Sequence, residues 1–339
     1  MHLLLRAVVG AACLLALPIP AALAQTITIK FSHVVAVDTP KGKAAEKFKQ
    51  LAETASKGRV KVEVYPNSQL YKDGDELEAL QRGAVHLLAP SVSKFGPLGV
   101  REFEVFDLPY LFPNTETVYR VTDGEIGRNL FAKLEPKGIK GLAYWDNGFK
   151  ALSANRPLRR LSDFRALKVR VQSSKVLSST FRTLGAIPQV MAFSEVYTAL
   201  QQGVVDGQEN SISNLYTQKM HEVQRHVTLS DHGYLVYAVI ANKKFWDGLP
   251  ADIRTLLEQA MKDATRYERA ISAKENADAL AAVKAAGTTE VYLLPDKDRA
   301  EWQKALLPVH REFESAIGRD LIHGIYAVSN QVAEERRKR

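Results

Sequence analysis

The sequence predicts an α/β protein of two domains with mixed sheets, joined by crossing strands and bridged by one long helix. First, strand-like and helix-like hydrophobic periods alternate along most of the chain, which is typical of α/β layers. Second, the chain is longer than a single hydrophobic core usually supports. Third, one helical period extends over residues 250–286, which is longer than a small domain is wide.

The chain of 339 residues begins with a segment typical of a signal peptide. Arg6 supplies one positive charge, an apolar stretch covers residues 7–17, and Ala22-Leu23-Ala24 forms an A-x-A cleavage site. A transmembrane anchor needs about 20 consecutive apolar residues, whereas Pro18 already interrupts this run. We therefore expect residues 1–24 to be removed and the protein to be exported.

Composition narrows the kinds of site that the exported chain can form. Cys13 is the only cysteine and lies within the leader, so the mature chain is expected to have neither a disulfide nor a thiolate site. Lipid attachment at Cys13 is disfavoured because the leucine usual three positions earlier is missing. The formal charge of +8 falls by one without Arg6 and favours anionic partners in general. Basic residues alternate with acidic ones, so no nucleic-acid partner is expected.

The first series of elements begins at Thr26. Period-two alternation or short apolar runs predict strands over Thr26–Phe31, Val60–Tyr65 and Val85–Ala89. Helical spacing covers Pro40–Lys57 and Asp73–Gln81. This regular alternation of strands and helices predicts a first α/β layer with much parallel pairing.

A second series begins near Ile139. Strands are predicted over 139–145, 150–154 and 167–171, and helices over 176–184 and 194–201. The turn-forming residues Asp146-Asn147-Gly148 are expected to separate the first two strands. Ser194 is expected to cap its helix, which Gly203 closes. These elements predict a second α/β layer.

The longest periodic segment opens at Leu249-Pro250 and stops at Gly287. A helix of that length reaches about 50 Å, so it is expected to bridge both domains. No Gly/Ser spacer separates the domains, which favours crossing strands over a flexible tether. The predicted boundaries are 25–147 and 236–275 for the first lobe, 148–235 and 276–329 for the second, and 330–339 for a frayed, solvated tail.

Enzyme and metal motifs are missing from the sequence. It contains no G-x-S-x-G elbow, no phosphate loop ending in Lys-Ser/Thr and no G-x-G-x-x-G. His226 follows His221-Glu222 one residue too late for a zinc helix, so an ordinary surface helix is favoured. Asp73-Gly74-Asp75-Glu76 lacks the ligand spacing of a calcium loop, and a helix-start cap explains it better. We expect no catalytic residue, metal or cofactor.

Three polar residues at strand ends are candidate ligands for an anion. Arg170 alternates with Val169 and Val171, and its planar fork suits a carboxylate, although a surface ion pair is the alternative. Asn210 follows a turn-rich segment, where its amide could donate to the same anion or tie a loop. Lys150 has the same two interpretations. Spacing alone leaves these alternatives open.

Many ordered segments of the chain resemble one family. The resemblance runs through IKFSHVVAVDTPKGKAAEKF, VEVYPNSQLYKD, APSVSKFGPLG, FEVFDLPYLF, AYWDNGFK, LKVRVQSSKVL, PQVMAFSEVYTALQQGVVDGQEN and FWDGLPADIR. On these segments the sequence resembles the extracytoplasmic solute-binding subunits of TRAP transporters, of the DctP type that binds C4-dicarboxylates. The resemblance implies a periplasmic-binding-protein-like clamp of two domains that closes on its ligand in the periplasm. It also implies that the small and large permease subunits are its partners.

The family pattern assigns roles to residues at matching positions. It implies that Arg170 grips a substrate carboxylate, that Asn210 supports the same group and that Phe193 lines the cleft. Lys150 stands where relatives often carry an arginine. For the second carboxylate the expected residues are Lys41, Ser91 and Lys94, joined by His33 and Tyr237.

Physical chemistry makes a separate demand on such a site. Burying an unpaired carboxylate is prohibitive, so each end of a dianion must meet cations and donors. Arg170 with Lys150, and Lys41 with Lys94, would give one basic cluster per end. We expect malate, succinate or fumarate as ligand and a monomer as the state of the protein. The alternatives are another keto, hydroxy or sugar acid, a ligand sensor acting on a membrane receptor, and an exported hydrolase or lyase.

Overall fold

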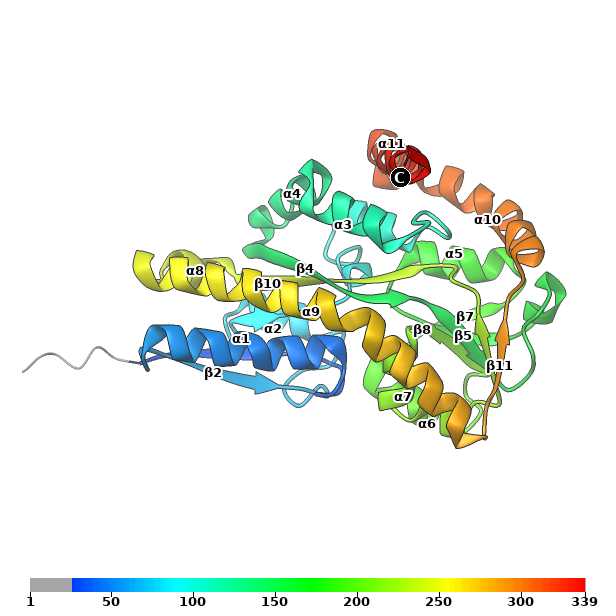
Figure 1. Cartoon of the computed structure of the whole chain (residues 1–339), viewed down its shortest axis with the longest axis horizontal. Helices are drawn as coiled ribbons and strands as arrows, with labels where there is room; N and C mark the ends of the chain where they lie inside the picture. The colour runs from blue at the N-terminus through cyan, green and yellow to red at the C-terminus, as the bar shows by residue number, and fades with distance from the viewer. Residues whose placement is uncertain (1–25, 339) are drawn as a thin grey trace, which may run out of the picture.

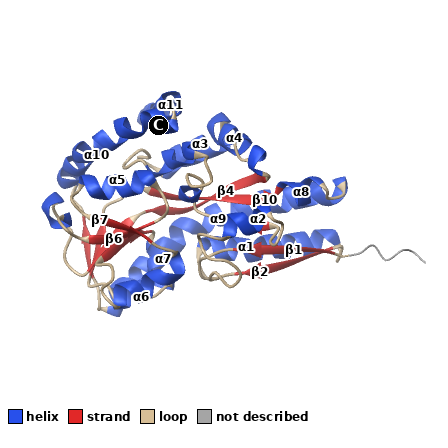
Figure 2. Ribbon diagram, turned by 180° about the vertical axis from the view of Figure 1, so that it is seen from behind, coloured by secondary structure: helices blue, strands red, loops and turns tan. Residues whose placement is uncertain are grey.

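The computed structural model describes residues 26–338 as an α/β protein with two β-sheets flanked by helices (Figure 1). Residues 1–25 and Arg339 lie outside the described part, and with them the predicted signal peptide and Cys13. The two sheets lie next to each other, and strands and a helix cross between them (Figure 2). The predicted α/β class is therefore confirmed. We call the part around the first sheet lobe I and the part around the second sheet lobe II.

Lobe I contains a five-stranded mixed sheet in the order β2-β1-β3-β10-β4. Its strands are β1 (Ile27–Ser32), β2 (Val60–Tyr65), β3 (Leu87–Leu88), β4 (Ile139–Phe149) and β10 (Tyr234–Asn242). Its helices are α1 (Pro40–Ser56), α2 (Glu76–Gln81), α3 (Thr115–Asp123), α4 (Glu125–Ala132) and α8 (Lys243–Asp247). Ile29 and Phe31, two residues apart on β1, bury the same face against Phe48 of α1, as the period of two predicts.

Lobe II contains a six-stranded mixed sheet in the order β11-β9-β5-β8-β6-β7. Its strands are β5 (Ala151–Ala154), β6 (Lys168–Val171), β7 (Ile187–Val190), β8 (Gly207–Asn210), β9 (His226–Leu229) and β11 (Glu290–Leu293). Its helices are α5 (Lys175–Thr183), α6 (Val196–Gln201) and α7 (Ile212–Thr217). β6 runs parallel to β7 and β8, so their carboxyl ends lie at one edge. That edge carries Arg170 and Asn210.

The chain crosses between the lobes where β4 leads into β5 and where β9 leads into β10. The predicted turn at Asp146-Asn147-Gly148 is wrong, because β4 continues through these residues and pairs with β10. The reason is tertiary, since α9 supplies the polar partners that such residues usually find in a turn. Asp146 accepts a hydrogen bond from Ser272 (2.6 Å), and the Asn147 carbonyl accepts one from Asn276 (3.0 Å).

Helix α9 (Ala251–Ala286) spans both lobes, as its length predicted (Figure 1). Its first half buries Ile253 and Leu257 in a core of lobe I, and its second half buries Ala279 and Val283 in a core of lobe II. Gly287 ends the helix with a left-handed φ of 68°, which confirms the predicted stop. Among residues 26–338, no helix combines the length and the apolar character that crossing a membrane requires.

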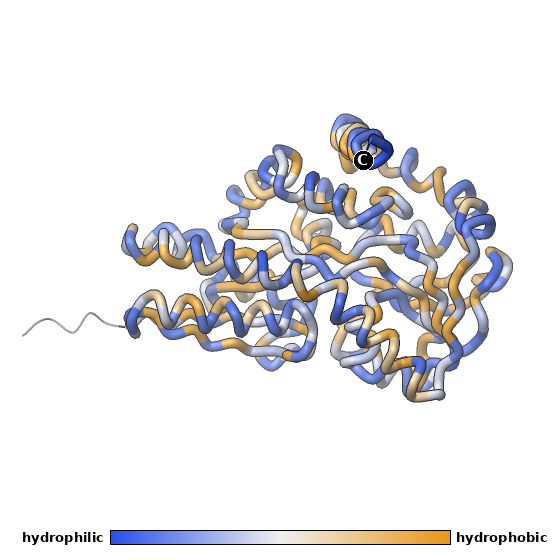
Figure 3. The backbone as a smooth tube through the Cα atoms, viewed as in Figure 1, coloured by the Kyte–Doolittle hydropathy of each residue, from blue (hydrophilic) through white to orange (hydrophobic). Residues whose placement is uncertain are grey.

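The C-terminal part forms two further helices, α10 (Asp296–Ile317) and α11 (Arg319–Lys338). The predicted frayed tail is wrong up to Lys338, because the hydrophilic end of α11 (Figure 3) docks on α3. Arg336 pairs with Glu116 at 3.0 Å, and Arg120 pairs with Glu335. Although the second lobe was expected to hold residues up to 329, α11 packs against lobe I and α10 contacts both lobes.

Two local predictions differ from the structure. Helix α6 begins at Val196, after a 3-10 turn over Phe193–Glu195, so Ser194 does not cap it. The Phe193 amide is instead bound by a carboxylate from lobe I, which fixes the turn. His221 lies in a 3-10 turn and His226 in β9, so the surface helix predicted there is wrong.

Candidate functional site

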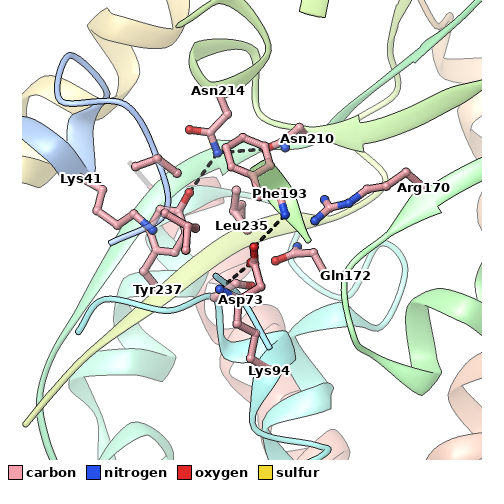
Figure 4. A pocket seen from close by; sticks show the side chains of 13 residues that line it. Lys41, Asp73, Lys94, Arg170, Gln172, Phe193, Asn210, Asn214, Leu235 and Tyr237 are labelled. Atoms are coloured by element: carbon pink, nitrogen blue, oxygen red, sulfur yellow. Dashed lines mark hydrogen bonds and ion pairs between the residues drawn. The ribbon is translucent and has the colours of Figure 1, made fainter. Parts of the chain in front are cut away.

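A cavity lies where the two lobes face each other (Figure 4). Lobe I contributes Val34, Val35, Lys41, Asp73, Ser91, Lys94, Leu235 and Tyr237, and lobe II contributes Arg170, Gln172, Phe193, Asn210 and Asn214. Val34 and Val35 also pack into the apolar core of lobe II beside Val196 and Ile212. The lobes are therefore in contact around the cavity, as in a closed clamp.

Arg170 enters the cavity from β6 with its guanidinium held in place (Figure 4). Its Nε and Nη2 donate hydrogen bonds to the Met191 carbonyl at 3.1 and 2.8 Å, and the guanidinium lies 5.7 Å from the centre of the Phe193 ring. The residue is only 2% exposed, and burial lowers the pKa of Arg170 while Asp73 and Glu209 oppose that shift. Because guanidinium carries five N–H donors, others stay available for an anion.

Asn210 ends β8 and Asn214 lies one turn later on α7. The Asn210 side-chain oxygen accepts from the Ser211 amide at 3.0 Å and from the Asn214 amide nitrogen at 2.9 Å. Asn214 also donates to the Tyr237 hydroxyl at 3.0 Å. Since these contacts occupy its oxygen, the side-chain NH₂ of Asn210 is the group left to donate toward the cavity.

Lys41 enters from the opposite side, on the first turn of α1 (Figure 4). Its side chain is 0% exposed, and its ammonium donates to the Ala89 carbonyl at 2.9 Å and lies 3.7 Å from the centre of the Tyr237 ring. Within residues 26–338, no carboxylate forms an ion pair with it. Burial, reinforced by the charge of Lys94, lowers the pKa of Lys41 to about 7.

Lys94 is buried near Lys41, but its charge is already balanced. Its ammonium pairs with Asp73 at 2.6 Å and with Glu76, and together these carboxylates outweigh burial and raise the pKa of Lys94. The prediction that these acids form a helix-start cap is wrong, because Asp75 occupies the N-cap position and makes no side-chain cap bond. Ser91, which also lines the cavity, donates to the Ser93 hydroxyl at 3.1 Å.

Lys150 and His33 are not among the residues that line this cavity. The Lys150 ammonium pairs with Glu209 at 2.9 Å and lies 3.7 Å from Asp107, so it does not form the basic cluster expected with Arg170. Lys150 is thus paired with carboxylates inside the protein although, like Arg170, it is buried in lobe II. His33 is also buried, and burial and the neighbouring Lys41 lower its pKa to about 3, so it is neutral.

Three polar residues that line the cavity were not predicted from the sequence. Gln172 lies two positions after Arg170, and this spacing would have placed both side chains on one face of an extended chain. Asn214 lies four positions after Asn210, which suits a helix that starts between them. No sequence signal marks Asp73, because its partners Lys94 and Phe193 are distant in the chain.

This arrangement suits a small anion with a charge at each end. One cation with spare donors enters from each lobe, and polar groups surround the space between them. The cavity can thus bind and enclose a ligand, and its two charged ends belong to separate lobes.

Comparison with known proteins gives a consistent result. The family model described as bacterial extracellular solute-binding protein, family 7, matches residues 31–316. The chain is 62% identical over 327 residues to the C4-dicarboxylate-binding periplasmic protein DctP of Rhodobacter capsulatus, covering 96% of this chain and 98% of that protein.

Two solved structures are similar over nearly their whole length. A TRAP periplasmic solute-binding protein from Shewanella oneidensis with bound succinate has a TM-score of 0.88 and 42% identity, covering 90% of this chain and 99% of that one. A TRAP periplasmic solute-binding protein from Pseudomonas aeruginosa with bound L-malate has a TM-score of 0.82 and 42% identity, covering 84% and 99%. Both of those proteins hold a bound dicarboxylate.

Proposed function

The chain belongs to family 7 of the bacterial extracellular solute-binding proteins, and from this premise we propose that it captures malate, succinate or fumarate by lobe closure. The family is one of solute-binding proteins and not of enzymes. The observation that carries the proposal is that Arg170 and Lys41, each with spare donors, enter one cavity from opposite lobes. A four-carbon dianion offers one carboxylate to each.

At the lobe II end, Arg170 and the Asn210 amide hold one carboxylate. At the lobe I end, Lys41 holds the other, and Ser91 and Tyr237 supply hydroxyl groups beside it. Each charge-assisted hydrogen bond contributes about 1.5–3 kcal/mol, so a handful suffices for the roughly 8 kcal/mol of micromolar affinity after ordering costs. Because only the closed state brings both lobes to the ligand, binding shifts the population toward closure.

The closed, loaded protein hands its ligand to a membrane transporter. Similarity to the DctP proteins and to TRAP solute-binding structures supports the small and large TRAP permease subunits as partners and the periplasm as location. Val34 and Val35 pack against the core of lobe II, so closure also covers apolar surface that an open form would expose. A permease can therefore distinguish the closed form from the open one by shape.

Titration calorimetry with a panel of acids tests this function. Succinate, L-malate and fumarate are compared with butyrate, which lacks the second carboxylate, with glutarate, which is one carbon longer, and with galactonate, a sugar acid. We expect the C4-dicarboxylates to bind at least about tenfold more tightly than the others, since each of these loses or misplaces a charged contact. Tighter binding of galactonate or butyrate than of every C4-dicarboxylate would overturn the assignment.

A further inference from the structure

An acidic side chain stands in the wall of this anion-binding cavity. Asp73 belongs to the segment before α2 in lobe I, yet it contacts both lobes. Its Oδ1 pairs with the Lys94 ammonium of lobe I at 2.6 Å, and its Oδ2 accepts a hydrogen bond from the Phe193 amide of lobe II at 2.7 Å (Figure 4). The carboxylate therefore bridges the cleft with one oxygen for each lobe.

The contact on lobe II falls at the turn that orients Arg170. Arg170 donates twice to the carbonyl of Met191, and its guanidinium lies over the ring of Phe193. Only Ala192 lies between Met191, whose carbonyl holds the arginine, and Phe193, whose amide donates a hydrogen bond to Asp73. Movement of the turn away from lobe I would break the bond to Asp73 and shift the groups that hold Arg170.

We propose that Asp73 is an interlobe latch, a positioning residue that holds the closed state and fixes the turn carrying the Arg170 contacts. This inference rests on the proposed capture of a ligand by lobe closure and adds a residue that links closure to the geometry of the carboxylate site. Lys94 serves the latch, because its ammonium holds Asp73 in place from lobe I. Its charge is thus used within the protein rather than on the ligand.

Two neighbouring contacts across the cleft are more exposed than the latch, and the buried one, from Asn214 to the Tyr237 hydroxyl, joins neutral groups. Lys72 pairs with Glu195 at 2.8 Å, but both side chains are about half exposed, and surface pairs contribute little. Gln218 donates to Asn67 at 3.2 Å, also at the surface. Asp73 is 14% exposed and is hydrogen-bonded by ionised and backbone donors, which makes its contact the stronger one.

The latch carries a negative charge at every physiological pH. Burial acts to raise the pKa of Asp73, but Lys94, Arg170 and the Phe193 amide outweigh it and lower the pKa to about 2. Asp73 thus remains an acceptor for the Phe193 amide whether or not a ligand is present. Closure consequently adds a charge-assisted hydrogen bond that the protein makes with itself.

The test measures closure and ligand release in the same variants. Spin labels on Gln50→Cys in α1 and Gln202→Cys after α6, both at exposed positions, report the distance between lobes. We expect Asp73→Ala to lengthen that distance in saturating succinate and to speed succinate dissociation about ten- to a hundredfold. The association rate should change less than about threefold, because encounter with the open form does not need the latch.

Asp75→Ala is the matched control, since it removes an exposed acid two residues away that makes no cap bond. Asp73→Asn keeps an oxygen for the Phe193 amide but loses the ion pair, so its dissociation rate should fall between wild type and Asp73→Ala. Equal distances and rates in Asp73→Ala and Asp75→Ala would overturn the latch. If Asp73→Ala fails to fold, Asp73→Asn is compared with Asp75→Asn instead. Equal succinate dissociation rates in these two variants would overturn the latch.

A failure of the proposed function can be distinguished from a failure of the latch. If the wild type bound no dicarboxylate, the latch would be judged from the label distances without ligand. Asp73→Ala must then be more open than Asp75→Ala, and indistinguishable distributions would reject the latch.

Discussion

The two ends of the cavity present their positive charge in different ways. In lobe II the guanidinium of Arg170 is fixed by the Met191 carbonyl and keeps further N–H donors unused. Lys150 is equally buried, but its ammonium forms an ion pair with Glu209. In lobe I the ammonium of Lys41 has a carbonyl and a ring as its partners, whereas Lys94 is balanced by Asp73 and Glu76. Each lobe thus has one cation available to a ligand and one bound within the protein.

Under the proposed function, the buried cations that bind the ligand are those whose charge the protein leaves uncompensated. A cation that is paired internally stabilises the lobe, and its removal leaves a buried acid alone. An uncompensated one costs desolvation free energy until an anion arrives. Substitutions should therefore separate the two classes, with affinity responding to Arg170 and Lys41 and stability responding to Lys150.

The largest loss of affinity is expected for Arg170→Ala. Two charge-assisted hydrogen bonds to one carboxylate are worth about 3–6 kcal/mol, so succinate affinity should fall roughly a hundred- to ten-thousandfold. Calorimetry measures this loss, and a thermal melt checks that the ligand-free variant stays folded. Arg182→Ala, at an exposed position of α5, is the control and should bind normally. Unchanged affinity in Arg170→Ala would remove it from the site.

Lys41→Met should produce the next largest effect. It removes one charged contact at a similar side-chain volume, so succinate should bind about ten- to a hundredfold more weakly. Butyrate, without a second carboxylate, should lose much less. Lys49→Met on the same helix is the control. Equal losses for succinate and butyrate would place Lys41 away from the second carboxylate.

Affinity should also depend on pH through Lys41. Its pKa of about 7 in the ligand-free protein rises when a carboxylate binds beside it, so above pH 7 binding takes up a proton. Succinate affinity should therefore fall by up to about tenfold per pH unit between pH 7.5 and 9, and it should change little between pH 6 and 7. Calorimetry in buffers of different ionisation enthalpy measures the proton uptake. The same slope in Lys41→Met would contradict this assignment.

Stability should show the opposite trend with pH in the ligand-free protein. The pKa of Lys41 is lowered from 10.5 to about 7 by folding, so the unfolded chain binds more protons between these values. The contribution of Lys41 to the free energy of unfolding therefore increases as pH rises from 7 toward 10. Comparing urea unfolding of wild type and Lys41→Met at pH 7 and 9 isolates this contribution, and an identical pH response in both proteins would refute it.

The smallest effect on affinity, within about threefold, is expected for Lys150→Met. Its cost should appear in stability instead, because Glu209 and Asp107 would be left buried without their counterion. Breaking such a pair costs about 3–5 kcal/mol of unfolding free energy, which urea denaturation can measure. A loss of affinity as large as that of Arg170→Ala would restore Lys150 to the ligand site.

The sequence predicted elements more reliably than their connections. The α/β alternation, the strand at 60–65 and the bridging helix ending at Gly287 follow from local period and capping, which depend mainly on residues near in sequence. The turn at Asp146-Asn147-Gly148 failed because Ser272 and Asn276 of α9 bind these residues within a strand. Similarly, the charged end of α11 was predicted to be a solvated tail, but Glu116 and Arg120 of α3 form ion pairs with it.

The sequence by itself determined the class of the protein and most of the polar residues that line its interlobe cavity. Arg170, Asn210, Phe193, Lys41, Ser91, Lys94 and Tyr237 were singled out from strand ends and family motifs, and the fold brings them around one cavity. Only the tertiary structure decided which cations are available there. Charge compensation is a contact between residues far apart in the chain, such as Lys150 with Glu209 or Lys94 with Asp73, and no local pattern encodes it.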